Sequence, residues 1–359
     1  MTRSTDPVPR ATMRDVAAQA GVSLKTVSRV VNEEPGVREV VVDRVRSVAA
    51  ELGYRHHRGA SDLRRRGQRT GAIGVLVQDV ANDYSARLLR ALEDATRARG
   101  LILLAASIDE DPDRERHLVG QMLARRVDAL VLMATTPRQD YLLPDIRAGL
   151  GVVCVDRAPV GVEVDAVTID NVGGSRAAVE RLLDQGHRRV AFLGDLPNLA
   201  TAHDRFAGFR EALANRGAVP DPALVRHGLR TAEEARRAVE EMLTRSAPPT
   251  AIFAARNVLT TGCLLALHHD VGRSTPPAIA GFDDMAHLDL VGRPLLIVRQ
   301  DVEEIGRTAA RLLEERLLSP TRRARSVVLA PELVSYGDPG ARRRAPATRP
   351  GRAGAAANR

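Results

Sequence analysis

Residues 12–32 read TMRDVAAQAGVSLKTVSRVVN and decide how the N-terminal part of the chain folds. Apolar residues first recur at the i, i+3, i+4, i+7 spacing of one helix face, in Met13, Val16, Ala17 and Ala20. Gly21 interrupts this pattern, and glycine suits the left-handed conformation that ends a helix. A second amphipathic segment begins after Ser23, which is a typical N-cap residue. The spacing therefore predicts two short helices joined by a tight turn.

A third helix is predicted over residues 38–52, after the break at Pro35-Gly36. One side of this helix carries the residues expected to face inward, namely Val41, Val45, Val48, Ala49 and Leu52. Three helices in this order, two of them joined by a glycine turn, are typical of helix-turn-helix domains, which read DNA with the second helix. We place this domain at residues 11–58 and expect residues 1–10 to be disordered.

Composition limits the classes of protein to which the chain can belong. Its 359 residues exceed one ordinary core and predict two or three domains. Cys154 and Cys263 are its only cysteines, too few for a disulfide framework or an all-thiolate zinc site. The sequence holds no apolar run of about 18 residues and no apolar signal segment. We therefore expect a cytoplasmic protein without a membrane partner.

Positive charge is concentrated at both ends of the chain. Residues 1–69 hold 14 Lys and Arg against 8 Asp and Glu, and residues 338–359 hold 6 against 1, whereas residues 70–337 hold 33 against 36. Such a distribution favours a nucleic acid partner, although a merely solubilising excess of charge is the alternative. Lys25 is the only lysine among the 53 basic residues. Residues 337–359 are rich in Arg, Ala, Pro and Gly, and we expect a disordered basic tail there.

From Gly71 onward, short apolar runs alternate with helical patterns. The apolar runs lie at residues 73–77, 101–105, 129–133, 152–155, 190–193, 251–254 and 278–280. The helical patterns lie at residues 85–99, 113–125, 173–185, 203–216, 231–245 and 259–270. Alternation of this kind predicts parallel sheets flanked by helices.

Residues 12–32 resemble the DNA-binding headpiece of the LacI/GalR family of transcription regulators. They carry the signature D-V-A-x-x-A-G-V-S-x-x-T-V-S-R-V-x-N in full. The resemblance implies a homodimer on palindromic double-stranded DNA, with Leu24, Lys25 and Arg29 at base edges in the major groove. Neighbouring side chains are predicted to contact phosphates or bases, namely Thr12, Ser23, Thr26, Ser28, Asn32 and Tyr54.

Residues 59–69 resemble the hinge helix of the same family, with ASDLRRRG matching an A-x-x-L pattern followed by basic residues. The resemblance implies that Leu63 wedges between base pairs in the minor groove. It also implies that Arg64, Arg65 and Arg66 contact phosphates or that groove. A charged linker without a specific role is the alternative.

The body of the chain, residues 70–336, resembles the effector-binding core of the family, which is itself similar to periplasmic sugar-binding proteins. Cores of this kind have two lobes that close around a ligand. The predicted lobes cover about residues 70–165 plus 298–320 and about residues 166–297 plus 321–336. The predicted fold class is therefore α/β, with an all-α headpiece and a two-lobed core of parallel sheets flanked by helices.

Ligands of open α/β sheets bind at the carboxyl ends of strands, where several polar residues of this chain lie. Asp156 and Asp283 follow two predicted strands, and their carboxylates suit adjacent hydroxyl groups. The resemblance implies that Arg205 and Asp283 anchor hydroxyls of a sugar-like effector, and Tyr84 can cover an apolar ring face. Capping of a following helix is the alternative for each aspartate. The full predicted effector site is Tyr84, Asp156, Arg205, Arg256, Asp283 and Gln300.

Arg256 departs from the family pattern, which often has asparagine at this place in an A-N-D or A-N-N motif. A guanidinium in the cleft would favour an anionic effector. Alternatively, the side chain points outward, or the pocket no longer binds ordinary sugars.

These patterns together predict a sequence-specific DNA-binding transcription regulator, a repressor, whose operator affinity is controlled by a small sugar-like effector between two lobes. A solute-binding protein without a regulatory role is the alternative, which the headpiece disfavours. The sequence has no Walker A, H-E-x-x-H or G-x-S-x-G motif and no G-x-G-x-x-G after a strand. We therefore expect no enzymatic activity, no cofactor and no metal.

Overall fold

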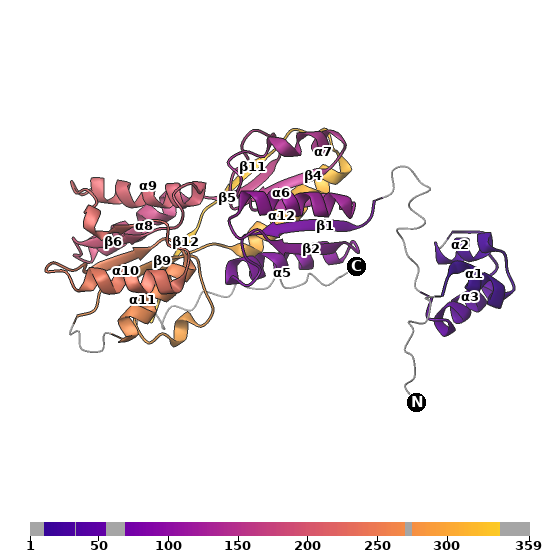
Figure 1. The fold of residues 1–359 in the computed structure, drawn as a ribbon, viewed down its shortest axis with the longest axis horizontal. Coiled ribbons are helices and arrows are strands. Elements are labelled where there is room, and N and C mark those ends of the chain that lie inside the picture. Colours follow the sequence, from indigo (N-terminus) through magenta and orange to yellow (C-terminus); the bar gives the residue numbers. More distant parts are fainter. Residues whose placement is uncertain (1–10, 33, 55–68, 270–274, 338–359) are drawn as a thin grey trace, which may run out of the picture. The chain divides into compact units, whose positions relative to one another are not determined.

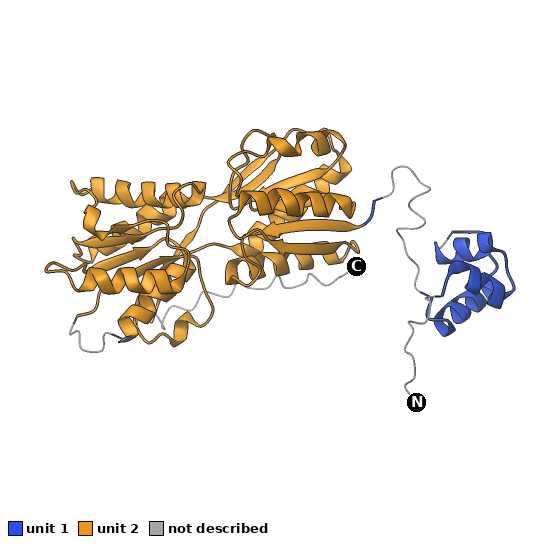
Figure 2. Cartoon of the chain, in the orientation of Figure 1, with its two compact units in different colours: residues 1–70 blue, residues 71–359 orange. Residues whose placement is uncertain are grey.

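The computed structural model describes residues 11–32, 34–54, 69–269 and 275–337 (Figure 1). The chain divides into two compact units, Met1–Thr70 and Gly71–Arg359, and each is described by itself (Figure 2). Several predictions fall outside the described residues. They concern the expected disorder of residues 1–10 and 338–359 and the hinge residues Leu63, Arg64, Arg65 and Arg66.

The first unit contains the three predicted helices, α1 (Met13–Ala20), α2 (Leu24–Val31) and α3 (Glu39–Glu51). Thr12 and Asp15 form a capping box at the start of α1, in which the Thr12 N–H donates to the Asp15 carboxylate at 2.7 Å. Gly21 ends α1 with φ of 66°, a conformation that glycine adopts without strain. Valines from all three helices form the small buried core, namely Val16, Val27, Val30, Val45 and Val48.

The first lobe of the second unit is built on a sheet with strand order β11-β5-β4-β3-β1-β2, and all neighbouring strands run parallel. Its strands are β1 (Ala72–Val77), β2 (Ile102–Ser107), β3 (Ala129–Leu132), β4 (Gly151–Val155), β5 (Asp165–Ile169) and β11 (Ser326–Leu329). One face is covered by α5 (Asp83–Arg97) and α12 (Val302–Leu318). The other is covered by α6 (Pro112–Ala124), the turn η1 (Asp140–Leu142) and α7 (Leu143–Arg147).

The second lobe is built on a sheet with strand order β12-β10-β9-β8-β6-β7, parallel except for β12, which is antiparallel to β10. Its strands are β6 (Val190–Leu193), β7 (Val225–Arg226), β8 (Ala251–Ala254), β9 (Ala278–Phe282), β10 (Leu295–Arg299) and β12 (Glu332–Tyr336). One face is covered by α8 (Asn171–Asp184) and α9 (Ala200–Ala214). The other is covered by α10 (Ala232–Leu243) and α11 (Asn257–His269). Two short turns, η2 (Pro222–Leu224) and η3 (Leu288–Leu290), complete the lobe.

Within the described residues, the chain passes between the two sheets three times, after β5, after β10 and after β11. The lobe boundaries therefore differ from those predicted at 165/166 and 320/321, because β5 and β11 both belong to the first sheet. β5 was not predicted because it begins with a charged residue, Asp165, instead of an apolar run. Asp165 is fully buried there because the guanidiniums of Arg316 and Arg322 donate to its carboxylate at 3.0 and 2.7 Å.

None of the helices that the structure describes is long and apolar enough to cross a membrane.

Candidate functional site

The second helix of the headpiece presents the residues that the sequence assigns to base reading. Leu24 is 45% exposed, and Lys25 is also exposed. Arg29 is more constrained, because its Nη2 donates to the Pro35 carbonyl at 2.9 Å and its Nε lies 3.8 Å from the Glu34 carboxylate. The loop before α3 therefore holds the Arg29 guanidinium near the surface of α2 in the absence of DNA.

The polar residues around α2 already have structural partners. Ser23 caps α2 by accepting a hydrogen bond from the Thr26 N–H at 3.1 Å, and the hydroxyls of these two residues lie 2.9 Å apart. The Asn32 amide donates to the Ser28 hydroxyl at 3.3 Å. Tyr54 packs partly buried against the core, and this burial raises the pKa of its phenol. Local capping and packing thus account for these side chains in the free headpiece, whereas their DNA contacts stay predictions.

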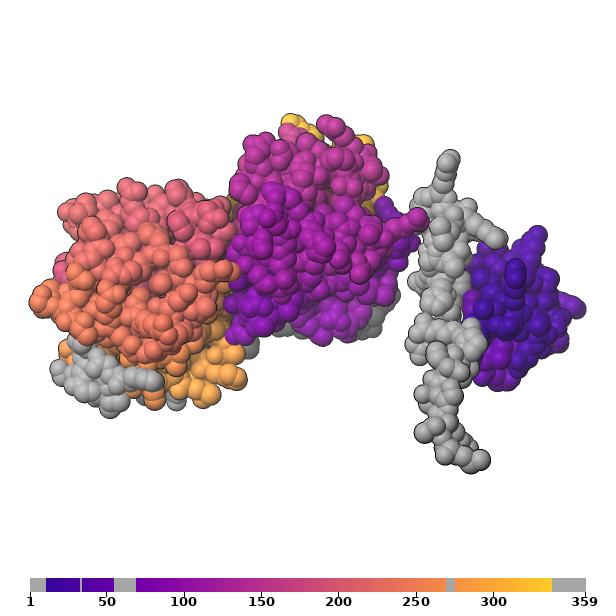
Figure 3. All heavy atoms as spheres, in the orientation of Figure 1, coloured from indigo at the N-terminus to yellow at the C-terminus, as the bar shows by residue number. Residues whose placement is uncertain are grey.

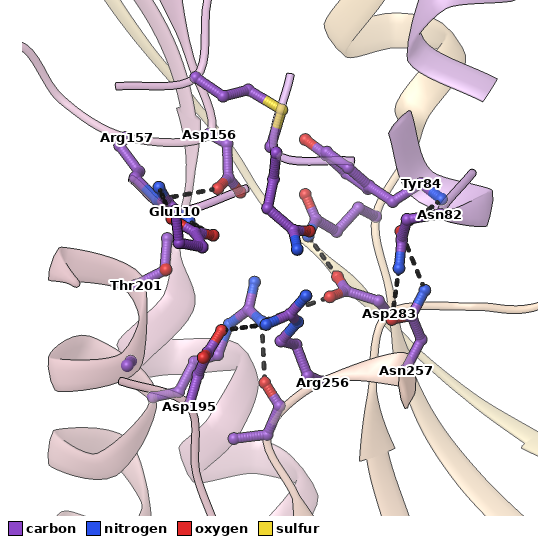
Figure 4. Close-up of a pocket in the computed structure, with 16 residues that line it drawn as sticks. Asn82, Tyr84, Glu110, Asp156, Arg157, Asp195, Thr201, Arg256, Asn257 and Asp283 are labelled. Carbon is purple, nitrogen blue, oxygen red and sulfur yellow. Dashed lines mark hydrogen bonds and ion pairs between the residues drawn. The ribbon is translucent and has the colours of Figure 1, made fainter. Parts of the chain in front are cut away.

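A pocket lies between the two lobes of the second unit (Figure 4). Its empty space is about 450 Å³ when the open solvent at its entrance is included. The first lobe contributes side chains from α5 and the end of β4, and the second contributes side chains from α9 and the loops after β8 and β9. All six predicted effector residues line it, namely Tyr84, Asp156, Arg205, Arg256, Asp283 and Gln300. The structure therefore brings the whole predicted set together.

Asp156 and Asp283 occupy equivalent positions in the two lobes. Each follows an inner strand of its sheet with a left-handed backbone, with φ of 67° and 71°. Each N–H donates to the neighbouring strand, Asp156 to the Val167 carbonyl at 3.0 Å and Asp283 to the Val298 carbonyl at 2.9 Å. Neither residue directly precedes a helix, so the capping alternative does not apply. Strained backbone of this kind is concentrated at functional sites.

Arg205 is the centre of a buried polar network in the second lobe. Its Nε donates to the Asn171 side-chain oxygen at 2.8 Å, and its Nη1 donates to the Ala255 carbonyl at 2.8 Å and to Asp283 at 3.3 Å. The guanidinium carbon also lies 3.8 Å from the centre of the Phe282 ring, a cation–π contact. The Gln300 amide donates to the other oxygen of Asp283 at 2.5 Å. The network fixes both side chains that the sequence analysis assigned to hydroxyl anchoring.

Arg256 lies in the pocket and forms an ion pair with Asp195, so its side chain does not point outward (Figure 4). A second ion pair joins Arg157 to Glu110, with two hydrogen bonds of 2.6 and 2.8 Å. Glu110, Arg157 and Asp195 were not predicted as site residues. Glu110 and Asp195 both follow strands, β2 and β6, at the carboxyl ends where ligands bind. Applying the strand-end rule to every strand would have found them.

Burial and neighbouring charge perturb the acids of the pocket. Burial raises the pKa of Asp156, although the guanidiniums of Arg157 and Arg205 oppose the shift. Burial also raises the pKa of Tyr84, and the charges of Asp156 and Asp283 raise it further. For Glu110 burial acts in the same direction, but hydrogen bonds from Arg157 outweigh it and hold the pKa below its usual value. The pocket is therefore a desolvated site in which a neutral phenol faces partly uncompensated carboxylates.

Direct contacts join the two lobes beside the pocket. The side-chain amides of Asn82 and Asn257 exchange hydrogen bonds of 3.1 and 3.2 Å. The Ala286 N–H donates to the Asp83 carboxylate at 2.8 Å. In the space-filling view the lobes abut along their shared boundary (Figure 3). Polar contacts near the pocket thus join the two lobes.

The described residues contain no cluster of three or more His, Cys, Asp or Glu side chains arranged to hold a metal ion. Cys154 and Cys263 are both buried, and burial raises the pKa of each thiol to about 12. Neither thiol lies in an environment that favours the reactive thiolate.

Two family models match the chain. The model for bacterial regulatory proteins of the lacI family matches residues 12–56, and the model for periplasmic binding proteins and the sugar-binding domain of the LacI family matches residues 70–331. The HTH-type transcriptional regulator CelR of Thermobifida fusca is 32% identical over 336 residues, which are 90% of this chain and 97% of that protein. Catabolite control protein A of Priestia megaterium is 29% identical, over 90% of this chain and 98% of that protein.

Solved structures agree with these matches. A CelR–cellobiose complex covers 92% of this chain and 100% of its own, with a TM-score of 0.66 and 30% identity. A lac repressor dimer bound to operator and the anti-inducer ONPF covers 91% of this chain and 98% of its own, with a TM-score of 0.76 and 25% identity. The named relatives are transcription regulators and not enzymes. With a matching headpiece and a matching effector-binding core, the chain belongs to the LacI family of bacterial regulatory proteins.

Proposed function

We propose that the protein is a dimeric transcription repressor whose affinity for a palindromic operator is controlled by a small sugar-like effector in the pocket between the lobes. One observation carries the proposal: six side chains predicted from the sequence line one pocket in a chain that also has a helix-turn-helix domain. The relatives support it, since one is crystallised with cellobiose and another as a dimer on its operator.

On the DNA side, α2 enters the major groove. Leu24 makes apolar contact, for instance with a thymine methyl group, and Lys25 donates to the O6 and N7 acceptors of guanine. Arg29 exchanges its hydrogen bond to the Pro35 carbonyl for a base or phosphate acceptor. Leu63, Arg64, Arg65 and Arg66 keep the hinge roles predicted from the sequence. We also propose a cytoplasmic location, which the match to bacterial DNA-binding regulatory proteins supports.

On the effector side, the Arg205–Asp283 pair binds hydroxyl groups from the second lobe, while Asp156 and Tyr84 contact the ligand from the first. A ligand that touches both lobes changes their closure. In a dimer this change alters the spacing of the two headpieces and therefore the affinity for DNA. The coupling is expected to be about 1–3 kcal/mol.

Selection of bound fragments from random duplex DNA, with and without a panel of sugars, tests the proposal. We expect enrichment of a palindromic site and a change in its affinity with at least one sugar. A protein that binds a sugar but enriches no duplex sequence would instead be a solute-binding protein.

The selected site then allows a test of base reading. Arg29→Ala should weaken binding to that site by about 1–3 kcal/mol and relax its sequence preference. Arg44→Ala, which removes an exposed arginine from α3, is the matched control and should change only the salt-dependent part of binding. Thermal unfolding of both variants checks that the headpiece stays folded, and equal loss of specificity in both would contradict the assignment.

A further inference from the structure

The charges that line the pocket do not cancel. Its charged side chains are three guanidiniums and four carboxylates, those of Arg157, Arg205, Arg256, Glu110, Asp156, Asp195 and Asp283. Each guanidinium has a carboxylate partner of its own, in the pairs Arg157–Glu110, Arg205–Asp283 and Arg256–Asp195. The one carboxylate left over is that of Asp156.

Asp156 has no short ion pair of its own. Among the described residues its carboxylate is ion-paired with one cation, the Nε of Arg157 at 3.6 Å, which is too far for a hydrogen bond. The same guanidinium makes two much shorter bonds to Glu110. Asp156 is only 8% exposed, so water compensates its charge poorly. A buried carboxylate in this setting gains most from a ligand that brings positive charge and hydrogen-bond donors.

Other pocket atoms also lack partners. Three pocket atoms are buried without a hydrogen bond among the described residues, namely the Tyr84 hydroxyl, the Oε1 of Gln300 and the Nε of Arg157. The Arg157 Nε is a donor that lies 3.6 Å from the Asp156 carboxylate, whereas the other two atoms accept hydrogen bonds, and Oε1 can do nothing else. Buried polar atoms are rarely left unsatisfied unless a bound molecule completes them. Tyr84 and Asp156 line the pocket from the first lobe (Figure 4), and Gln300 lines it from the segment between β10 and α12, so these three residues offer acceptors to a ligand.

We infer that the effector is a polyhydroxyl compound that carries a protonated amine, such as an amino sugar, with its ammonium group at Asp156 and its hydroxyls at the Arg205–Asp283 pair. This inference rests on the proposed function and names the ligand class of the same pocket. It argues against the anionic effector that Arg256 suggested, because Asp195 already neutralises that guanidinium. A carboxylate or phosphate entering the pocket would meet the negative charge of Asp156, while each of the three guanidiniums is already ion-paired with another carboxylate.

Matched sets of small molecules test the inference on the full chain near neutral pH and at equal ionic strength. Each set contains an amine, its neutral parent and a carboxylate: glucosamine, glucose and glucuronate, the corresponding galactose and mannose series, and Tris, pentaerythritol and 2,2-bis(hydroxymethyl)propionate. Thermal shift ranks the members, and calorimetry measures the affinity of those that bind. We expect the amine to bind about fivefold to tenfold more tightly than its neutral parent, and the carboxylate to bind least.

Two variants show whether Asp156 is responsible. Asp156→Asn should bind the amine and its neutral parent equally. Asp113→Asn makes the same chemical change on an exposed face of α6, and it should keep the preference for the amine.

The wild-type ranking decides the inference by itself. The inference is overturned if the neutral or anionic member of the sets binds the wild-type protein as tightly as the amine does. It is also overturned if, in every set, no member binds more tightly than the other two. Operator binding that still responds to a neutral sugar would then leave the proposed function standing, so the two failures can be told apart.

Discussion

At the scale of single residues, the pocket depends on ion pairs whose members come from distant parts of the chain. Arg256 and Asp195 lie after different strands of the second sheet, and both side chains are about nine-tenths buried. Removing one partner from such a pair leaves a buried charge uncompensated, which costs more than the pair itself contributes.

We therefore expect Arg256→Ala to lower the free energy of unfolding by about 2–4 kcal/mol. The double variant Arg256→Ala/Asp195→Ala should cost less than the sum of the two single variants, because it leaves no isolated charge. Urea denaturation of the four proteins in the cycle measures this difference. Additive costs would mean that the two side chains do not interact.

Asp156 should make the ligand-free core less stable at neutral pH. Since its pKa in the folded protein is raised, the folded state favours the protonated form over the ionised one. Protonation of Asp156 therefore stabilises the folded state. This stabilisation is fully present below the ordinary pKa of aspartate, and it is lost as the pH rises through the raised pKa of Asp156 in the folded protein. Asp156→Asn removes the titration altogether, because its amide stays neutral.

The difference in stability between Asp156→Asn and the wild type should therefore grow in favour of the variant from acid to neutral pH. Thermal unfolding without ligand, measured across this range, gives the difference directly. The exposed control Asp113→Asn should show no such trend. A difference that stays constant, or that shifts in favour of the wild type, as the pH rises would contradict the assigned direction.

At the scale of elements, glycine sets how closely two helices of the second lobe pack. A Cβ at Gly208 in α9 would collide with the Val172 carbonyl and with Ser175 of α8. We expect Gly208→Ala to force the helices apart and to lower the free energy of unfolding by about 1–3 kcal/mol.

Gly120 offers the matched control for this prediction, since it lies on an exposed face of α6 with open space around it. Gly120→Ala should raise the free energy of unfolding by about 0.5–1 kcal/mol, because alanine is the better helix former. Denaturation of the two variants side by side provides the test, and the same sign for both would refute the packing argument.

The recognition helix should depend on its cap. Ser23→Ala removes the acceptor for the Thr26 N–H and should cost about 1 kcal/mol of headpiece stability. Faster hydrogen exchange of the α2 amides is the expected readout. Ser47→Ala deletes an exposed hydroxyl within α3 and should leave the exchange unchanged. Equal effects of the two changes would show that the cap contributes nothing specific.

The elements that could be predicted are those whose apolar spacing is regular over a helix or an inner strand. The third headpiece helix, predicted over residues 38–52, is α3, and the first two occur before Gly21 and after Ser23 as predicted. Further strands were missed. The edge strand β12 has no apolar run, because its polar and apolar side chains are mixed. The inner strand β10 and the edge strand β11 do contain apolar runs, at residues 295–298 and 327–329, so the same reasoning applied there would have found them. α12 was missed although Val302, Ile305 and Ala309 carry the helical spacing, so the same reasoning applied there would have found it.

The pocket also has residues that the sequence could predict and contacts that it could not. Strand ends marked Asp156 and Asp283 as candidates, because the position of a residue after a strand is written in the sequence. The pairing of Arg157 with Glu110 is not, since the two residues meet only when β2 and β4 are placed in one sheet. Which charges of the pocket are paired could therefore be learned only from the three-dimensional structure, and the ligand class that we infer depends on that pairing.

At the scale of the whole molecule, the helix-turn-helix domain and the pocket lie in different units of the chain. The pocket lies entirely within the second unit, and its lining uses no residue of the headpiece. A chain reduced to residues 71–337 should therefore bind the effector with an affinity within about twofold of the full chain, and it should lose operator binding. Calorimetry and gel shift measure the two properties. A reduced chain that folds but no longer binds the effector would show that the headpiece contributes to the pocket.

Two of the three passages between the lobes hold the pocket network directly. Asn171 follows β5 and accepts from Arg205, and Gln300 follows β10 and donates to Asp283. The two side chains that we propose as hydroxyl anchors are thus hydrogen-bonded to residues of the segments that connect the lobes. Under the proposed function, a ligand that displaces Arg205 or Asp283 would act directly on these connections, and no separate relay of residues would be needed to carry the signal out of the pocket.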